Sequence, residues 1–584
     1  MAVYDKNKLG DIRPNQIITT FGPGSIVDAV KDSVTVLDIN YWKDKGTRII
    51  DGRLASYLNV DCFYMPKTSG GRDIPVTSFP YMHICSSSKC GNIFDARDNF
   101  NLDRYIWNGV TCPKCGWRAY PSRFITICDN GHMDDFPWRW WCHHGNTDCK
   151  KDMRMYSTGN SSTLADMWVE CQCGAKRSMS GATQKESMEG LQCTGHHPFR
   201  PHHKNEKCTL MRTPSQRGAS NVYFAVSRSA ISIPPWINPL YNLIDEHLRR
   251  IEEYKEDWGE DGVDKVYNKY FAENYSREEF DAALKRRQEN IKEFTEIKQM
   301  EYDAITHHAD PQYQSNKRHF KAEDEPVPDY LKAYFKQIIR ITRLREVKVL
   351  LGFTRVDAPD PDADVQQNVV YLTRGKEERW LPAAETHGEG VFIEFNRDTL
   401  DKWLNDPAVG ALSKKYEECY EEFCKSKGWT ITVKRDARYV MMHTFAHLLI
   451  KQMAMFSGYS SAAIRERIYF GDRMSGILLY TGSSDKEGSL GGLVELGTIK
   501  NLRVLMRDAF QEALLCTNDP ECMNNTPAGK NSNGAACHSC CMISETACEN
   551  GNRMLDRGLV VPISDRENQA YFRKLVTDLC QLEI

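Results

Sequence analysis

Hydrophobic residues recur at helical spacing in the middle of the chain. Ser276 and Glu279 form a capping box, because the serine caps a free backbone N–H and the glutamate reaches back. Four apolar residues follow at roughly helical intervals, namely Phe280, Leu284, Ile291 and Phe294. A clearer stripe consists of Leu331, Tyr334, Phe335, Ile338 and Ile339. The pattern therefore predicts helices within residues 236–300 and again after residue 330, joined by a polar, proline-containing loop over Tyr302–Pro328.

The two ends of the chain show mixed patterns. Ser33–Ile39 is typical of a strand, as are Ile468–Phe470 and Gly476–Tyr480. Tyr439–Phe456 is apolar enough for a buried helix, and a further helix is predicted near Leu502–Leu515. We therefore expect both helices and strands in the C-terminal part.

Cysteines are the most informative residues of the chain, and twelve of the 21 precede residue 210. The polar N-terminus lacks the apolar core of a signal peptide, and no apolar stretch is long enough to span a membrane. We therefore expect a cytoplasmic protein with reduced thiols. Paired cysteines then indicate structural Zn²⁺, two to four ions in all, with iron–sulfur clusters or free thiols as alternatives.

The spacing of the N-terminal cysteines predicts three zinc sites. The first is a ribbon-like set of two pairs, Cys85, Cys90, Cys112 and Cys115. The second consists of Cys128, His132 and Cys149, completed by His143 or His144. The third consists of Cys171, Cys173, Cys193 and Cys208, for which His196, His197, His202 or His203 could substitute. A set of four protein ligands leaves no position for water, so such sites are expected to be structural.

A second cysteine cluster lies near the C-terminus. Cys537 and Cys540 are the surest pair, and Cys516 and Cys522 are expected to complete the site. Cys548 competes for the fourth position, whereas Cys541 is expected to pack as a small apolar residue. His443 and His447 share one helical face at a spacing that can hold a metal, but no glutamate follows the first histidine, so a buried or capping role is favoured.

Composition and these motifs suggest the organisation. A chain of 584 residues with 41% hydrophobic and 27% charged residues fits several globular domains. We expect a mixed α/β multidomain protein, with zinc-ribbon or knuckle modules in the N-terminal half and a four-cysteine zinc site in a C-terminal α/β domain. The expected units are an α/β lobe (1–84), a cysteine-rich zinc-binding region (85–215), a helix-rich middle region (216–435) and a C-terminal domain (436–584).

The net charge of −3 excludes a chain that binds nucleic acid through its overall charge, so any such contact must be local. Lys332, Lys336 and Arg340 lie off the apolar stripe of the helix expected after residue 330. They are either a solvated face or candidates for DNA contact. The sequence lacks the G-x-x-x-x-G-K-[ST] phosphate loop, so no nucleotide cradle of that type is expected.

Several segments along the chain resemble one protein family. They are Ile12–Asp28, Asp135–Trp138, Gln216–Phe224, Arg343–Arg355, His443–Ile450, Gly488–Val494 and Gly534–Cys540. Together they resemble the DrmB family of the bacterial DISARM anti-phage system. The C-terminal part is also similar to the four-cysteine domain that ends MrfA-type DNA-repair helicases, and this similarity favours Cys516, Cys522, Cys537 and Cys540 as zinc ligands.

This resemblance implies a partner rather than an enzyme. In the family, DrmB forms a heterodimer with DrmA, a superfamily 2 helicase, and the pair binds and translocates on DNA and restricts incoming phage DNA. No membrane or small-molecule substrate is implied. The alternative function is a metal-dependent hydrolase, perhaps a nuclease, with an open zinc site. Nucleases usually gather carboxylates around Mg²⁺, and the sequence shows no such cluster.

Overall fold

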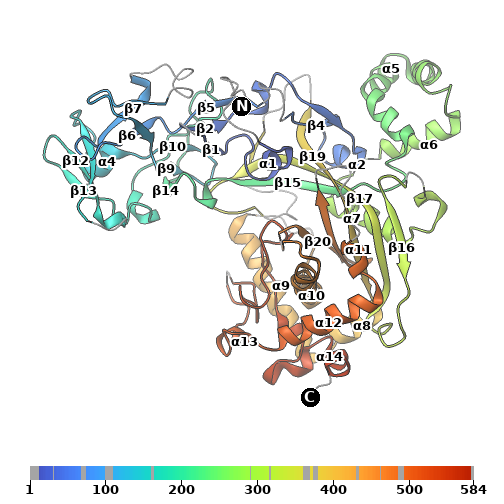
Figure 1. Cartoon of the computed structure of the whole chain (residues 1–584). Helices are drawn as coiled ribbons and strands as arrows, with labels where there is room; N and C mark the ends of the chain where they lie inside the picture. The colour runs from blue at the N-terminus through green and yellow to red at the C-terminus, as the bar shows by residue number, and fades with distance from the viewer. Residues whose placement is uncertain are drawn as a thin grey trace, which may run out of the picture.

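The computed structural model describes residues 12–29, 32–67, 74–98, 109–159, 163–289, 291–314, 317–359, 368–372, 379–428, 433–460, 462–483, 492–529 and 531–580. A lobe of short strands lies on one side of the molecule, a long curved sheet crosses the centre, and helices cover the sheet below (Figure 1). The expected mixed α/β class, with cysteine-rich modules toward both ends, is confirmed.

Two long antiparallel strands form the centre of the largest sheet. They are β17 (Phe335–Thr354) and β19 (Trp380–Phe395). The sheet runs in the order β15-β17-β19-β21-β20, with β15 at Phe224–Ile231, β21 at Met474–Ser483 and β20 at Ile464–Gly471. Four shorter strands attach to it, namely β3 (Thr47–Ile49), β4 (Cys62–Met65), β16 (Lys321–Glu325) and β18 (Val370–Tyr371). The sheet thus joins strands from three of the four expected units, whose boundaries remain predictions.

The two faces of this sheet bury different helices because successive strand residues point to opposite sides. Ile338 and Ile393 face α10 (Ala437–Ser457) in one core, together with α12 (Ile499–Leu514). Ile339 and Phe392 point to the other face, where α7 (Phe294–Thr306) packs. α10 is buried nearly all round, as expected for Tyr439–Phe456; Asp436 caps its first turn and Gly458, at φ 72°, ends it in the left-handed conformation.

A buried carboxylate connects the two edge strands of the central sheet. Glu301 on α7 accepts hydrogen bonds from the Ile231 N–H of β15 at 2.8 Å and from Arg467 Nε of β20 at 2.6 Å. The guanidinium of Arg467 also donates to the Ser229 carbonyl of β15, at 3.1 Å. β15 and β20 stand at opposite ends of the strand order. Because Glu301 and Arg467 bridge these two strands, the sheet must curl so that its edges approach each other.

The remaining helices surround this core. α5 (Pro239–Tyr270) is interrupted at Gly259, where φ is 61°, and it protrudes with α6 (Arg277–Arg287) at one corner of the molecule (Figure 1). The capping box of Ser276 and Glu279 is confirmed at the start of α6. The C-terminal helices are α8 (Arg397–Leu404), α9 (Pro407–Lys427), α11 (Gly492–Leu496), α13 (Glu521–Asn524) and α14 (Arg573–Cys580). Within the described residues, no helix combines the length and apolarity needed to cross a bilayer.

The cysteine-rich lobe contains two small sheets beside an N-terminal one. The six-stranded sheet has the order β13-β12-β11-β7-β6-β8, with bounds Lys176–Ser178, Met167–Cys171, Met153–Ser157, Asn92–Asp95, Met82–Cys85 and Ala119–Pro121. A second sheet joins β10 (Met133–Asp135), β9 (Phe124–Ile127) and β14 (Thr213–Gln216). The third comprises β1 (Ile26–Asp28), β2 (Ser33–Val36) and β5 (Val76–Ser78). The short helix α4 (Trp138–Cys142) belongs to this lobe, whereas α1 (Pro14–Thr19) and α2 (Gly52–Tyr57) precede it in the chain.

The prediction of a helix after residue 330 is wrong, and the prediction of a loop over Tyr302–Pro328 is wrong in part. Leu331 and Phe335 close a single turn through the Phe335 N–H and the Leu331 carbonyl, at 2.9 Å, and the chain then enters β17. Residues 302–306 complete α7, and 321–325 form β16. β17 pairs with four other strands, so tertiary backbone pairing overrides a local pattern that fitted a helix.

We predict that Glu301→Gln lowers the free energy of unfolding by about 3–5 kcal/mol, because the buried Arg467 guanidinium loses the carboxylate that accepts two of its hydrogen bonds and keeps, among the described residues, only Glu549, at 3.5 Å. The matched control is Glu253→Gln, which makes the same chemical change in an exposed pair with Arg249 and is expected to cost at most about 0.5 kcal/mol. Urea denaturation followed by circular dichroism measures both. Equal midpoints for the two variants would contradict the role given to Glu301.

Candidate metal centres

Among the groups of ligand atoms that converge in the described residues, four consist of cysteine sulfurs with at most one histidine nitrogen. In each group, the cysteine sulfurs and histidine nitrogens all lie within 4.8 Å of one another. Zn–S bonds of about 2.3 Å at tetrahedral angles would place two sulfurs about 3.8 Å apart. The donor sets and their spacing fit structural zinc ions, as expected.

The first group is Cys85, Cys90, Cys112 and Cys115, which is the set expected from sequence. β6 ends at Cys85, and Cys112 and Cys115 lie in a turn before β8. The Cys85 and Cys115 sulfurs are 3.4 Å apart, and those of Cys90 and Cys112 are 3.8 Å apart. Gly116 has φ of +74°, a conformation that side chains rarely adopt, which allows the tight turn after Cys115.

The second group differs from the expected one, because Cys128 and His132 meet Cys193 and Cys208 rather than Cys149. The physical reason is strand pairing. β14 pairs with β9, and the Gln192–Met211 bridge closes the loop before β14, so Cys193 and Cys208 are carried to the end of β9. These pairings join residues distant in sequence, and no local spacing indicated them.

His132 is oriented as a metal ligand would be. Its Nδ1 lies 3.2 Å from Cys128 Sγ, and its Nε2 lies 3.1 Å from the Glu206 carboxylate, which can fix the tautomer. A hydrogen bond from Cys128 lowers the pKa of Cys193 to about 4, so the group favours a thiolate. His197 also contacts Glu206, at 3.3 Å, and His196 contacts Asp134, whereas His202 and His203 are exposed.

The third group brings His143 and Cys149 to Cys171 and Cys173. β11 and β12 pair with Met153 opposite Cys171, which places Cys149, just before β11, at the end of β12. The Cys149 and Cys171 sulfurs are 3.6 Å apart, and His143 Nε2 is 3.3 Å from Cys173 Sγ. His143 Nδ1 faces the Arg139 carbonyl at 2.8 Å, so of the two histidines considered it is His143 that joins the group. The expected second and third sites therefore exchange partners.

The fourth group is Cys516, Cys522, Cys537 and Cys540, again as expected. Three sulfur pairs are separated by 3.5–3.7 Å: Cys516–Cys537 at 3.5 Å, and Cys522–Cys540 and Cys537–Cys540 at 3.7 Å. Cys541 is fully buried, and Cys548 is not in this group. Cys548 lies instead with His443, His447 and Glu466, all of them buried.

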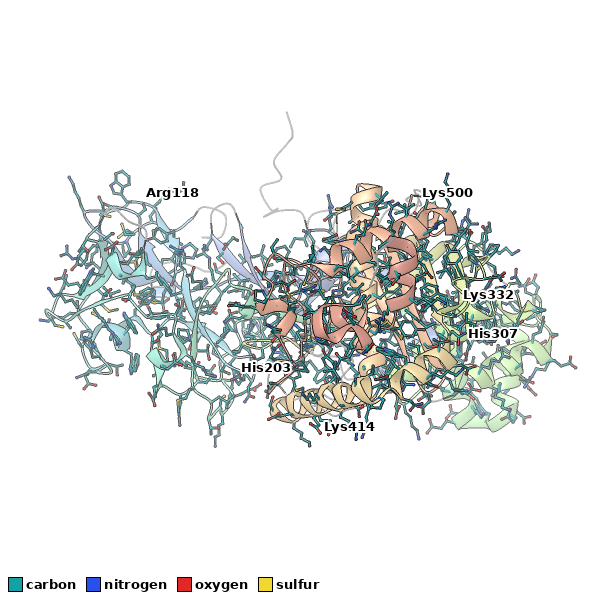
Figure 2. All side chains as sticks on the ribbon, turned by 90° about the horizontal axis from the view of Figure 1, so that it is seen from below. Arg118, His203, His307, Lys332, Lys414 and Lys500 are labelled. Atoms are coloured by element: carbon teal, nitrogen blue, oxygen red, sulfur yellow. The ribbon has the colours of Figure 1, made fainter. Side chains whose placement is uncertain are left out.

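The basic residues considered for DNA contact do not share a helix. Lys332 lies in the turn before β17, at the surface of the body opposite the cysteine-rich lobe (Figure 2), and its Nζ is 2.7 Å from Asp329. Lys336 and Arg340 lie on β17; they form ion pairs with Glu394 at 2.9 Å and with Glu325 at 3.1 Å. Acidic neighbours therefore partly offset their charge.

Comparison with known proteins agrees with these observations. Residues 445–541 match the MrfA Zn-binding domain, a range that contains the fourth group. Residues 13–224, which hold the other three groups, match a family described as a domain of unknown function, DUF8724. The chain is also 44% identical over 568 residues to a DISARM protein DrmB of Bacillus paralicheniformis, covering 94% of this chain and 100% of that protein. With this identity along nearly its whole length, the chain belongs to the DrmB family of DISARM proteins.

Proposed function

We propose that this chain is the non-catalytic, zinc-binding partner of the superfamily 2 helicase DrmA in the DISARM system. In this proposal the heterodimer binds and translocates on DNA and restricts incoming phage DNA in the cytoplasm. The observation that carries the proposal is the 44% identity to a DISARM protein DrmB over the whole of that protein. The match to the MrfA Zn-binding domain, named after a helicase family, supports it.

The chemistry of the four groups supports a structural rather than a catalytic role. Each offers four protein ligands, which fill the tetrahedral shell of Zn²⁺ and leave no position for a reacting water. The sequence also lacks the phosphate loop that cradles a triphosphate in helicases. ATP hydrolysis is therefore assigned to the partner, and no observation favours the alternative of a metal-dependent hydrolase.

The zinc ions would hold together a lobe whose strands are only 3–5 residues long. Structural zinc can contribute about 10–16 kcal/mol of apparent binding energy at neutral pH, which becomes folding energy where the apo site is not preformed. We assign as ligands the four sets described above, with Cys193 and Cys208 joined to Cys128 and His132, and with His143 and Cys149 joined to Cys171 and Cys173.

Two double variants distinguish this grouping from the one suggested by sequence spacing. Cys171→Ser with Cys193→Ser should remove two zinc equivalents per chain, because the two thiols belong to different groups. Cys128→Ser with Cys193→Ser should remove only one, because these thiols share a group. Plasma mass spectrometry of the purified soluble chain measures the zinc content. Each variant removes two thiols, so each controls for the other, and the reverse result would restore the spacing-based grouping.

Co-expression with the neighbouring helicase tests the partnership. A tagged copy of this chain should retain DrmA through size-exclusion chromatography, and the complex should hydrolyse ATP. A complex carrying a Walker-lysine variant of the helicase should show no turnover, because this chain lacks a nucleotide cradle of that type. ATP hydrolysis that survives this substitution, or elution of the two proteins separately, would refute the proposed division of labour.

We further propose that this chain contributes backbone-directed contacts to DNA through Lys332, Lys336 and Arg340. Replacing all three by Gln in the complex should weaken DNA binding and make the log–log salt dependence shallower by about 0.9 for each phosphate that is no longer neutralised. Glutamine is preferred to glutamate because Glu394 and Glu325 stand beside two of these side chains. Binding is measured by fluorescence anisotropy across a salt series.

The matched control replaces three exposed lysines of α9, Lys414, Lys415 and Lys425, by Gln. It removes the same charge from another surface of the body (Figure 2) and is expected to leave the slope unchanged. If the triple variant of Lys332, Lys336 and Arg340 behaves like this control, these residues are only a solvated face.

A further inference from the structure

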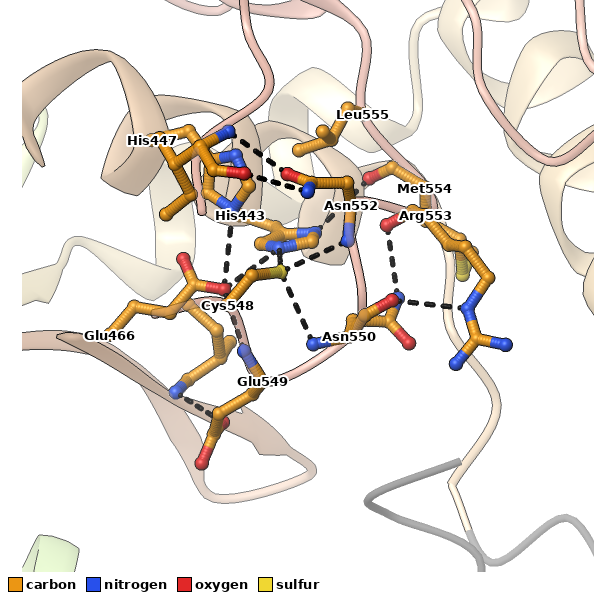
Figure 3. A network of polar contacts seen from close by, with 12 residues as sticks. His443, His447, Glu466, Cys548, Glu549, Asn550, Asn552, Arg553, Met554 and Leu555 are labelled. Carbon is orange, nitrogen blue, oxygen red and sulfur yellow. Dashed lines mark hydrogen bonds and ion pairs between the residues drawn. The ribbon is translucent and has the colours of Figure 1, made fainter. Parts of the chain in front are cut away.

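Four side chains from three distant segments meet in the core of the C-terminal part. His443 and His447 come from one face of α10, Glu466 from β20, and Cys548 from the loop that follows the fourth cysteine group (Figure 3). The two histidines are fully buried, Glu466 is 2% exposed and Cys548 is 9% exposed. The cluster is thus closed to solvent.

The ligand atoms of these side chains point at one another. His443 Nε2 lies 2.9 Å from Glu466 Oε1 and 3.2 Å from Cys548 Sγ. His447 Nε2 lies 3.3 Å from the same Glu466 oxygen. One atom from each of the four residues falls within 4.8 Å of the others. This convergence has the size of a coordination sphere around one transition-metal ion.

The opposite edge of each imidazole fixes its tautomer. His443 Nδ1 faces the Met554 carbonyl at 3.3 Å, and His447 Nδ1 faces the Cys541 carbonyl at 2.9 Å. A carbonyl oxygen only accepts, so both Nδ1 atoms must donate, and a neutral ring then directs its Nε2 lone pair into the cluster. Metal-binding histidines are held in this way, with the outer nitrogen donating to a backbone carbonyl.

Backbone N–H groups donate to Cys548 and Glu466 from the side away from the histidines. The N–H groups of Asn550 and Asn552 each donate to Cys548 Sγ at 3.3 Å, and that of Glu549 donates to Glu466 Oε1 at 3.2 Å (Figure 3). These donors suit a thiolate and a carboxylate. Glu466 Oε2 is also buried and has no hydrogen-bond partner within the part of the chain that the structure describes.

The charges balance with one divalent cation. A thiolate, a carboxylate and two neutral imidazoles carry −2, which a single M²⁺ cancels. Without a metal, protons would have to fill the gaps between the lone pairs. A neutral Cys548 thiol could donate to His443 Nε2, but the contact of His447 Nε2 with Glu466 Oε1 would still require a buried imidazolium ion or a protonated carboxyl group, and a buried ion has a desolvation cost of several kcal/mol.

We propose that His443, His447, Glu466 and Cys548 bind a further metal ion, separate from the four groups described above. One thiolate, two imidazoles and one carboxylate are all ligands that Zn²⁺ accepts in tetrahedral sites, so zinc is the ion assigned. The site is closed and structural. It connects α10 to β20 and to the loop after the fourth group. It also lies close to the fourth group, because the Cys541 carbonyl that contacts His447 follows Cys540 directly in sequence.

Anomalous diffraction from crystals of the unmodified chain tests this site directly. Data collected above and below the zinc edge should show a peak among the four ligand atoms, in addition to one at Cys516, Cys522, Cys537 and Cys540. A peak at the fourth group with none at the new site would overturn the proposal. A peak that follows the edge of another first-row metal would support the site and overturn the assignment of zinc.

A variant provides a second measurement. Cys548→Ala with His447→Ala should lower the zinc content of the full chain by one equivalent, measured by plasma mass spectrometry. The control is Cys580→Ala, which removes a thiol of equal exposure, 9%, that lies outside these groups and should leave the zinc content unchanged. A folded double variant with unchanged zinc content would overturn the proposal, and if the variant does not fold, the anomalous data on the unmodified chain decide. Neither experiment involves the helicase or DNA, so its outcome is independent of the proposed function.

Discussion

The backbone ladder between β17 and β19 is the interaction on which the rest of the molecule depends. These strands of 20 and 16 residues pair along most of their length. They also pair with strands from the N-terminal, middle and C-terminal parts of the chain, namely β4, β15, β16, β18 and β21. Long strands twist, and a twisted sheet with cores on both faces curls. Here the curl brings β15 and β20 close enough for Arg467 and Glu301 to connect them. A buried ion pair adds little net stability through its own attraction, but any arrangement that separates its partners is strongly destabilised, and so the pair favours this closure.

Away from the long sheet, the chain has less apolar surface to bury. The lobe around residues 82–216 is built from strands of 3–5 residues and modest apolar clusters, which include Trp138, Val110 and Ile125 respectively. Strands this short gain little from pairing alone. Each proposed zinc site of this lobe lies where a strand ends and the chain reverses, as at Cys85, Cys128 and Cys171. Chelation there would replace the ordering effect of a larger core, and this explains why ligands cluster in the part of the fold with the shortest elements.

The sequence was a good guide wherever the information was local. The capping box at Ser276 and the apolar run of α10 were both identified, since caps and helical periodicity depend on neighbours within a few residues. The grouping of the first and fourth cysteine sets also agrees with the prediction, because their paired cysteines lie close in sequence. The helix expected after Leu331 was wrong, because the pairing of β17 with distant strands decided its conformation. The exchange of partners between the second and third groups has the same origin, since β14 on β9 and β11 on β12 bring the ligands together. Glu466 carried no signal at all, because nothing near it in sequence is a ligand.

The position of the buried His443 cluster gives the C-terminal part a physical logic. Cys516 and Cys537 of the four-cysteine group are partly exposed, whereas Cys522, Cys540 and the following Cys541 belong to the apolar core that contains α10. These apolar contacts attach the module to the body, but they are not directional. The contacts of His447 with the Cys541 carbonyl and of Cys548 with His443 cross between the module and α10. Metal coordination at that junction would transmit the rigidity of the central sheet to the zinc module, because α10 packs directly on β20 and β21. In the proposed role, in which this chain supplies the helicase with a surface rather than with chemistry, such attachment would keep that surface fixed relative to the central sheet.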